Sequence, residues 1–104
     1  GATASIRGGS GSSAFAGAKF ALRALTQSMA RELGPEGIHV AHMIIDGAID
    51  TPWIKENFPD AYALKEKDGI LSPEKIAETY WSVHSQHRTA WTQELDIRPY
   101  MEKF

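Results

Sequence analysis

Residues 13–33 read SAFAGAKFALRALTQSMAREL, and after a Gly-Pro turn residues 38–45 read IHVAHMII. In the first stretch Leu22, Leu25 and Met29 recur at intervals of three and four residues, the period of an amphipathic helix. The second stretch is almost continuously apolar, which favours a strand buried on both faces of a parallel sheet. A strand, a helix and a second strand in this order form a βαβ unit. The sequence therefore predicts an α/β fold.

The predicted helix over 13–33 carries two different stripes. Arg23 and Gln27 lie on the side away from the leucines, so we expect the leucine stripe to face the sheet. A second stripe of small residues would let another helix approach closely, either within the protein or from a second subunit. Its members are Ala14, Gly17, Ala18 and Ala21.

The remaining segments have plainer signals. Residues 1–12 are small and glycine-rich, which indicates a strand end followed by a loop. Residues 46–71 contain two prolines and indicate a long, partly helical loop. A serine cap followed by proline begins a helix over 72–85, and alternating apolar residues over 92–98 predict a last strand. Ligands of such folds bind beyond the carboxyl ends of the strands, which directs attention to the loops.

Composition excludes several classes of function. The chain has 104 residues, 42% of them hydrophobic and 23% charged, as in ordinary globular domains. A net charge of −2 argues against nucleic-acid or anionic-membrane partners. No apolar run approaches the roughly 20 residues of a membrane helix. With no cysteine there is no disulfide and no thiolate chemistry.

Three other patterns leave alternatives open. Residues 9–14 fit the dinucleotide fingerprint G-x-G-x-x-A, although glycine-rich loops often produce such matches. His39 and His42 would point to opposite faces of a strand, so we expect surface histidines and no metal site. Asp46 and Asp50 flank the loop after the strand and could form an acid pair, but we expect turn and cap roles because no partner is evident.

The stretch 12–22, SSAFAGAKFAL, resembles the active-site helix of the short-chain dehydrogenase/reductase family, which carries Y-x-x-x-K there. Residues 46–51, DGAIDT, resemble the P-G-x-[IV]-x-T segment that follows the family's sixth strand. The resemblance covers nearly the whole chain and implies the C-terminal part of a Rossmann-like, doubly wound parallel sheet. It places Gly9 and Gly11 in the loop before the active-site helix, so the fingerprint interpretation is dropped.

The departures from the family pattern concern proton transfer. Phe15 falls at the position of the catalytic tyrosine and has no hydroxyl to donate or accept a proton. Ala2 falls at the position of the catalytic serine, thirteen residues earlier. Thr3 and Ser5 are the nearby hydroxyls. Lys19 is retained, and the resemblance implies that it binds the nicotinamide ribose.

Cofactor positions are better preserved than acid and base groups. Asp46 replaces the family's proline, whereas three residues remain where the family approaches the nicotinamide and phosphates: Gly47, Ile49 and Thr51. The spacing of three aromatic residues in the long loop favours core cover over the lining of a substrate pocket, whereas the resemblance places them in the family's variable substrate lid: Trp53, Phe58 and Tyr62.

The resemblance thus implies part of an NAD- or NADP-dependent oxidoreductase that transfers hydride to or from a carbonyl or alcohol substrate. The alternative is a catalytically degenerate relative that acts in nucleotide binding or oligomerisation. We expect a missing N-terminal half of the same fold as a partner, homo-oligomers formed through helix 13–33, and a cytoplasmic location. The 104 residues alone are expected to be inactive and to bind the cofactor weakly. The substrate and the choice between NAD and NADP stay open.

Overall fold

The structure, a computed structural model, describes residues 1–104. Strands β1 (His42–Ile45) and β2 (Glu94–Ile97) pair in parallel, with His42 opposite Glu94 and Ile45 opposite Ile97. Helices and parallel strands confirm the predicted α/β class. The helices, in chain order, are η1 (Thr3–Ser5), α1 (Ser13–Leu33), η2 (Gly34–Glu36), α2 (Pro52–Asn57), α3 (Pro59–Tyr62), η3 (Ala63–Lys67), α4 (Pro73–His84) and η4 (Arg88–Ala90).

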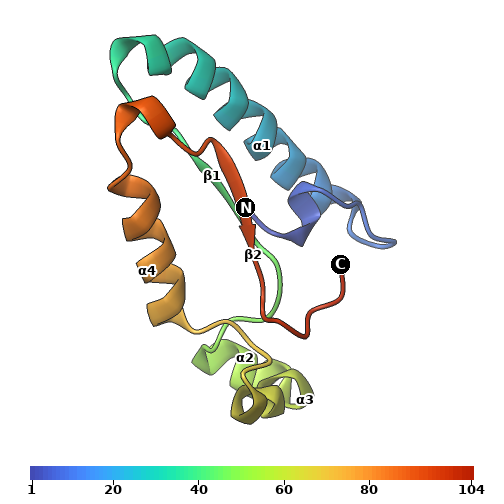
Figure 1. Ribbon diagram of the computed structural model, residues 1–104. Helices are drawn as coiled ribbons and strands as arrows, with labels where there is room; N and C mark the ends of the chain where they lie inside the picture. The colour runs from blue at the N-terminus through green and yellow to red at the C-terminus, as the bar shows by residue number, and fades with distance from the viewer.

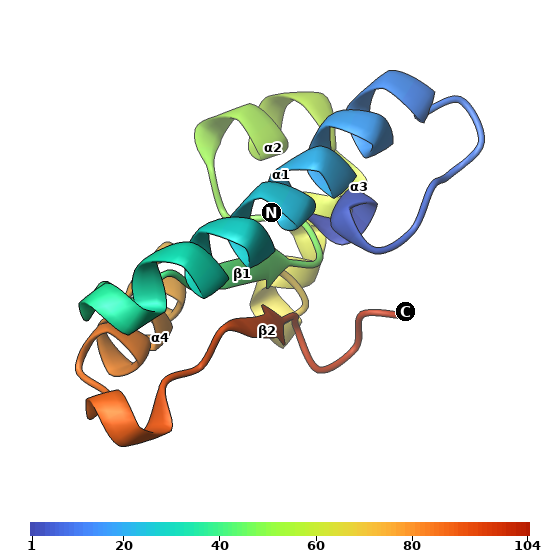
Figure 2. The same ribbon diagram turned by 90° about the horizontal axis from the view of Figure 1, so that it is seen from above.

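The two strands lie between the long helices α1 and α4, while α2 and α3 gather beyond the carboxyl ends of the strands (Figure 1). Seen from above, α1 crosses over β1 (Figure 2). A small apolar core forms where these elements meet: Ala16, Met43, Ile44, Ile70, Leu71 and Val83. No helix is both long and apolar enough to cross a membrane.

The strands are shorter than predicted. Of residues 38–45 only His42–Ile45 forms a strand, and of residues 92–98 only Glu94–Ile97 does so. The predicted strand end in residues 1–12 is reduced to one bridge, Ala2 with Ile45, after which the chain turns into η1. The physical reason is pairing, because a strand persists only where a neighbour accepts its backbone hydrogen bonds.

The buried face of α1 also differs from the prediction. The helix runs over the predicted residues 13–33, yet Arg23 points at β2 and donates to the two carboxylate oxygens of Glu94 at 2.7 and 2.8 Å. A charge-assisted pair across to the strand therefore sets the rotation of the helix. The leucine stripe is left exposed rather than facing the sheet: Leu22, Leu25 and Met29.

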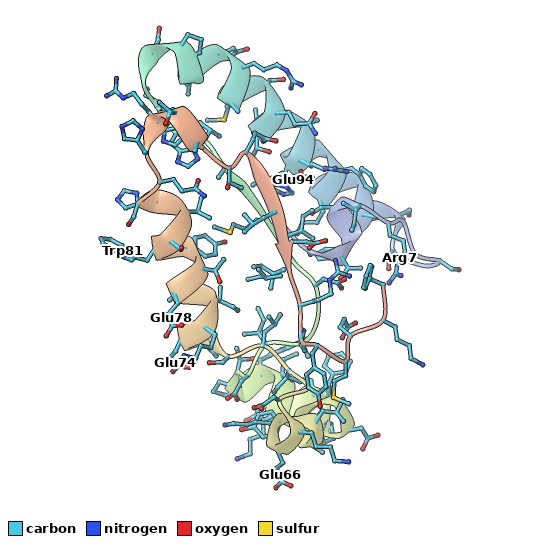
Figure 3. The ribbon with its side chains drawn as sticks, in the orientation of Figure 1. Arg7, Glu66, Glu74, Glu78, Trp81 and Glu94 are labelled. Atoms are coloured by element: carbon cyan, nitrogen blue, oxygen red, sulfur yellow. The ribbon has the colours of Figure 1, made fainter.

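The histidines of the first strand are not both at the surface, which corrects the expectation for His42. Its ring is 3% exposed, and Nδ1 lies 3.1 Å from Oε2 of Glu94 on the neighbouring strand. Glu94 thus joins α1, β1 and β2 through Arg23 and His42, and it lies between β2 and α1 (Figure 3). His39 stacks on Trp91, with ring centroids 4.6 Å apart.

Candidate functional site

A cavity of about 340 Å³ opens at the N-terminal end of α1. It brings together three residues that the sequence predicts as functional: Ala2, Phe15 and Gly47. Thr3, Ser12 and Arg7 also line it, and Arg7 is its one charged lining residue. Figure 3 shows Arg7 on the loop between η1 and α1. We call this space the first cavity.

Each predicted residue reaches the first cavity from a different element. Ala2 is held by its bridge to the last residue of β1, and Phe15 lies in the first turn of α1. Gly47 follows β1 with φ of +132°, a backbone conformation that side chains disfavour. A Cβ built there would lie 3.1 Å from Cδ of Pro99, so glycine lets the C-terminal segment pack closely.

Lys19 lies one helical turn beyond Phe15, and its ammonium is 5.5 Å from the centroid of the Phe15 ring. No carboxylate pairs with Lys19. Burial, and then the charge of Lys19, lowers the pKa of the Gly1 amino group. The lysine therefore stands beside the first cavity as an unpaired cation, without lining it.

Asp46 occupies the most enclosed position of the site, with a residue exposure of 1%. Oδ1 accepts a hydrogen bond from the Thr3 hydroxyl, and Oδ2 lies 3.0 Å from Nη1 of Arg98. The latter contact is an ion pair without hydrogen-bond alignment, so both atoms lack a hydrogen-bond partner. Arg98 also donates to Asp96 and stacks on Phe104, with its guanidinium carbon 3.7 Å from the ring centroid.

Two predicted cofactor residues lie away from the first cavity. Thr51 caps α2, accepting a hydrogen bond from the backbone N–H of Ile54 at 3.2 Å. Ile49 forms a bridge with Leu71 and does not line the first cavity. Thr51 and Tyr62 line a second cavity of about 640 Å³. The predicted cofactor residues are therefore divided between two places.

The predicted lid residues lie around α2 and α3. Trp53 and Phe58 contact each other, with ring centroids 5.5 Å apart, and both are more than half exposed. They therefore do not form core cover in this chain. Two lysine ammonium groups, of Lys55 and Lys65, lie 5.7 and 5.6 Å from the centroid of the Tyr62 ring.

Asp46 and Asp50 do not form an acid pair. Asp50 pairs with Lys65 at 2.9 Å, whereas Asp46 pairs with Arg98. Hydrogen bonds to Asp50 and then to Tyr62 raise the pKa of Lys65. The two aspartates therefore have separate structural roles.

Sequence reasoning missed the partners of Asp46 and the position of Arg7. Only the unusual Asp-Gly in place of Pro-Gly signalled that residue 46 has a special role. Of the two nearby hydroxyls, Ser5 is fully buried and accepts a hydrogen bond from the backbone N–H of Ala2 at 2.9 Å. Of these two residues, Thr3 lines the first cavity.

This geometry agrees with what the chain is similar to. The crystal structure of a short-chain dehydrogenase from Rhodopseudomonas palustris matches 96% of the chain with 49% sequence identity and a TM-score of 0.65. A family model described as enoyl-(acyl carrier protein) reductase matches residues 1–93. The chain belongs to the short-chain dehydrogenase/reductase family. A comparison with curated proteins gives no match.

This short-chain dehydrogenase/reductase chain spans 36% of the length of the Rhodopseudomonas protein. Members of this family usually use NAD or NADP. The first cavity has the size of a small ligand pocket. Its volume lies near the lower end of the roughly 300–1,000 Å³ of ligand pockets. It is lined by the aromatic residue Phe15, by Gly47, and by two residues that carry hydroxyls, Thr3 and Ser12.

Proposed function

We propose that the chain is part of an NAD(P)-dependent oxidoreductase that transfers hydride to or from a carbonyl or alcohol substrate. The observation that carries the proposal is the first cavity, which Ala2, Phe15 and Gly47 line together. These residues come from three separate segments, and the resemblance to the family assigns them to its serine, tyrosine and nicotinamide positions. Family membership supports an oxidoreductase role for the whole protein.

The residues that would bind the cofactor are distinct from the acid and base groups that transfer the proton. In this proposal Lys19 binds the nicotinamide ribose, and the segment with Gly47, Ile49 and Thr51 lies along the nicotinamide and phosphates. The unpaired ammonium of Lys19 supports this assignment, because a free cation can donate to ribose hydroxyls. When bound, the nicotinamide supplies or accepts the hydride.

The substrate would enter between the first cavity and the aromatic residues of α2 and α3. Trp53, Phe58 and Tyr62 form the proposed lid, and the exposure of the first two leaves them free to contact a ligand. Phe15 keeps an aromatic surface at the proposed tyrosine position but cannot transfer a proton. The proton must therefore move through another hydroxyl or through water.

We further propose that the rest of the fold comes from an N-terminal half carrying the phosphate-binding loop. The match to only 36% of the related chain supports this view. The exposed leucine stripe of α1 supports homo-oligomers formed through that helix. By analogy with the family the parent protein is expected in the cytoplasm.

The test uses the full-length parent protein. Binding of NADH and NADPH is measured by calorimetry, and their oxidation is followed with aldehydes, ketones and an enoyl thioester, the last chosen from the description of the matching family model. We expect binding of at least one cofactor and turnover with at least one substrate class. No cofactor binding by the full-length protein would contradict the proposal.

Two lysine variants make the experiment specific. Lys19→Ala is expected to weaken cofactor binding about tenfold, as loss of a charged hydrogen-bond donor does. Lys75→Ala is the matched control, because its ammonium pairs with Glu78 at 3.0 Å on exposed α4. Equal effects of both variants would remove Lys19 from the proposed site.

A catalytically degenerate relative is the second candidate. The absence of a hydroxyl from both Phe15 and Ala2 favours it, because proton transfer would lack its usual groups. In that case the full-length protein binds NADH or NADPH but oxidises neither with any substrate class. The isolated 104 residues should bind weakly in either case, and a micromolar dissociation constant for them would contradict this expectation.

A further inference from the structure

The backbone of Asp46 is held in place by both strands. It directly follows β1, and its backbone N–H donates to the carbonyl of Ile97, the last residue of β2, at 2.9 Å. The side chain then meets two partners from opposite ends of the chain, Thr3 and Arg98. Its position is therefore set by backbone pairing rather than by a flexible loop.

The direction of the Thr3 hydrogen bond follows from this arrangement. A carboxylate paired with a guanidinium has acceptor sites only, so the Thr3 hydroxyl must donate its single proton to Asp46. Thr3 is only partly buried and lines the first cavity. The Thr3 oxygen can therefore act toward a ligand there only as a hydrogen-bond acceptor, through a lone pair.

Arg98 makes this direction hard to reverse. Its guanidinium is held by Asp46, by Asp96 and by the face of Phe104. A side chain held on three sides keeps its charge against Oδ2 of Asp46, which leaves Oδ1 to face Thr3. Through Asp46, the Arg98 cation thus determines that the Thr3 oxygen presents a hydrogen-bond acceptor to the first cavity.

The other groups around the first cavity do not duplicate this role. Ala2 and Phe15 have no hydroxyl, and the hydroxyl of Ser5 is fully buried. Ser12 lines the first cavity without a carboxylate partner, so its proton is free to point either way. Thr3 is the hydroxyl there whose direction a buried charge fixes.

We propose that Thr3 binds the substrate in the first cavity as a hydrogen-bond acceptor, and that Asp46 and Arg98 impose this polarity. The inference rests on the proposed function, which makes the first cavity the substrate site, and it adds a substrate class. At Thr3 the ligand must present a hydroxyl donor, so this contact favours alcohols over the corresponding ketones. Asp46 and Arg98 are positioning residues in this account.

The test measures binding without turnover, on the full-length protein, by calorimetry or ligand-observed NMR. Cyclohexanol and cyclohexanone serve as probes because they share their ring and differ in having or lacking a donor. We expect cyclohexanol to bind about three- to tenfold more tightly, the effect of one hydrogen bond. Equal dissociation constants would overturn the inference alone. Absence of binding by both probes would overturn the proposed function as well.

The Asp46→Asn variant tests the proposal through a change in the preference between the two probes, which is more specific than a loss of affinity. Arg98 will attract the amide oxygen, which turns the amide NH₂ toward Thr3 and makes Thr3 accept from it. The Thr3 proton is then released to the first cavity, where both probes can accept it. We expect cyclohexanone to bind about as tightly as cyclohexanol, and a retained alcohol preference would refute the polarity argument.

Thr3→Val is the second variant, because it removes the hydroxyl without leaving an unpaired cation. We expect it to abolish the preference by weakening cyclohexanol alone. Thr79→Val on α4 is the matched control, since its hydroxyl donates to the carbonyl of Lys75 far along the chain. A preference that survives Thr3→Val, or that disappears equally in Thr79→Val, would contradict the assignment. Thermal unfolding of each variant establishes that it is folded.

Discussion

The ammonium of Lys19 lies 5.5 Å from the centroid of the Phe15 ring, one helical turn along α1. Residues four apart share a helix face, so this neighbourhood follows directly from the spacing F-x-x-x-K. The pair now makes a cation–π contact. A hydroxyl added to the ring would sit near a cation that favours its ionised form.

Phe15→Tyr is expected to raise carbonyl reduction by the full-length protein. A positioned acid typically contributes about 10²–10⁴-fold to a proton-transfer step. Turnover with a fixed ketone and saturating cofactor measures the change. Phe20→Tyr is the matched control, because it adds the same hydroxyl further along α1 at an exposed position. Unchanged turnover in Phe15→Tyr would mean that Phe15 does not occupy the tyrosine position of the active site.

The free energy of unfolding should depend on pH through Glu94. A hydrogen bond from Arg23 lowers the pKa of Glu94, against a smaller opposing effect of burial and with further help from His42. Because the folded state binds this proton less readily than the unfolded chain, the stabilisation is present above the ordinary pKa of 4.5. It is lost as the pH falls through the lower, folded value.

Glu94→Gln should therefore reduce stability by about 1.5–3 kcal/mol at neutral pH, the contribution of a charged hydrogen bond. The deficit relative to the unmodified protein should shrink in acid. Urea unfolding at about pH 7 and about pH 3 measures both values. Glu66→Gln is the control, since Glu66 lies on exposed η3 without an ion-pair partner. A deficit of equal size at both pH values would show that the carboxylate charge is not responsible.

Gly47→Ala should destabilise the protein by about 1–3 kcal/mol, because alanine disfavours the positive φ there and its Cβ would press on Pro99. Gly34→Ala is the opposite case: Gly34 has φ of −54°, and no atom lies within 4 Å of an added Cβ. That control is expected to be neutral or stabilising. Chemical denaturation compares the two, and equal effects would contradict the role assigned to Gly47.

Leu25→Glu should lower the oligomeric mass of the full-length protein. Leu25 is 55% exposed within the leucine stripe of α1, and a buried glutamate in a subunit contact would be costly. Arg31→Glu is the control, because it makes a larger charge change, of two units instead of one, on another side of the same helix. Sedimentation velocity distinguishes the two variants. An oligomer that persists in Leu25→Glu would remove this face of α1 from the proposed interface.

Local features of the chain could be predicted from sequence. Apolar periodicity and the Gly-Pro stop located helix 13–33, and the rule that sites lie beyond strand ends directed attention to the loops that carry Ala2 and Gly47. The rotation of α1 could not be predicted. It depends on the ion pair between Arg23 and Glu94, which lies 71 positions later in the chain. Hydrophobic periodicity identifies the apolar face of a helix, but it does not reveal which charged residue of a distant strand will pair with that helix.

The same limit applies to His42 and Asp46. Each was interpreted from its neighbours in sequence, as a surface histidine and as a turn or acid-pair residue. Their partners come from distant segments: Glu94 for His42, and Thr3 with Arg98 for Asp46. Whether a polar group can be buried depends on such hydrogen-bonding partners, and a local sequence pattern does not contain them.

The contact between Thr3 and Asp46 spans 43 positions, and Arg98 joins it from near the other end of the chain. Closing loops of this length costs entropy, so such contacts form after local helices and turns. The orientation of the Thr3 proton is therefore acquired late in folding. A graft of η1 onto another scaffold would carry Thr3 without Asp46 and Arg98, so it would not transfer the binding preference.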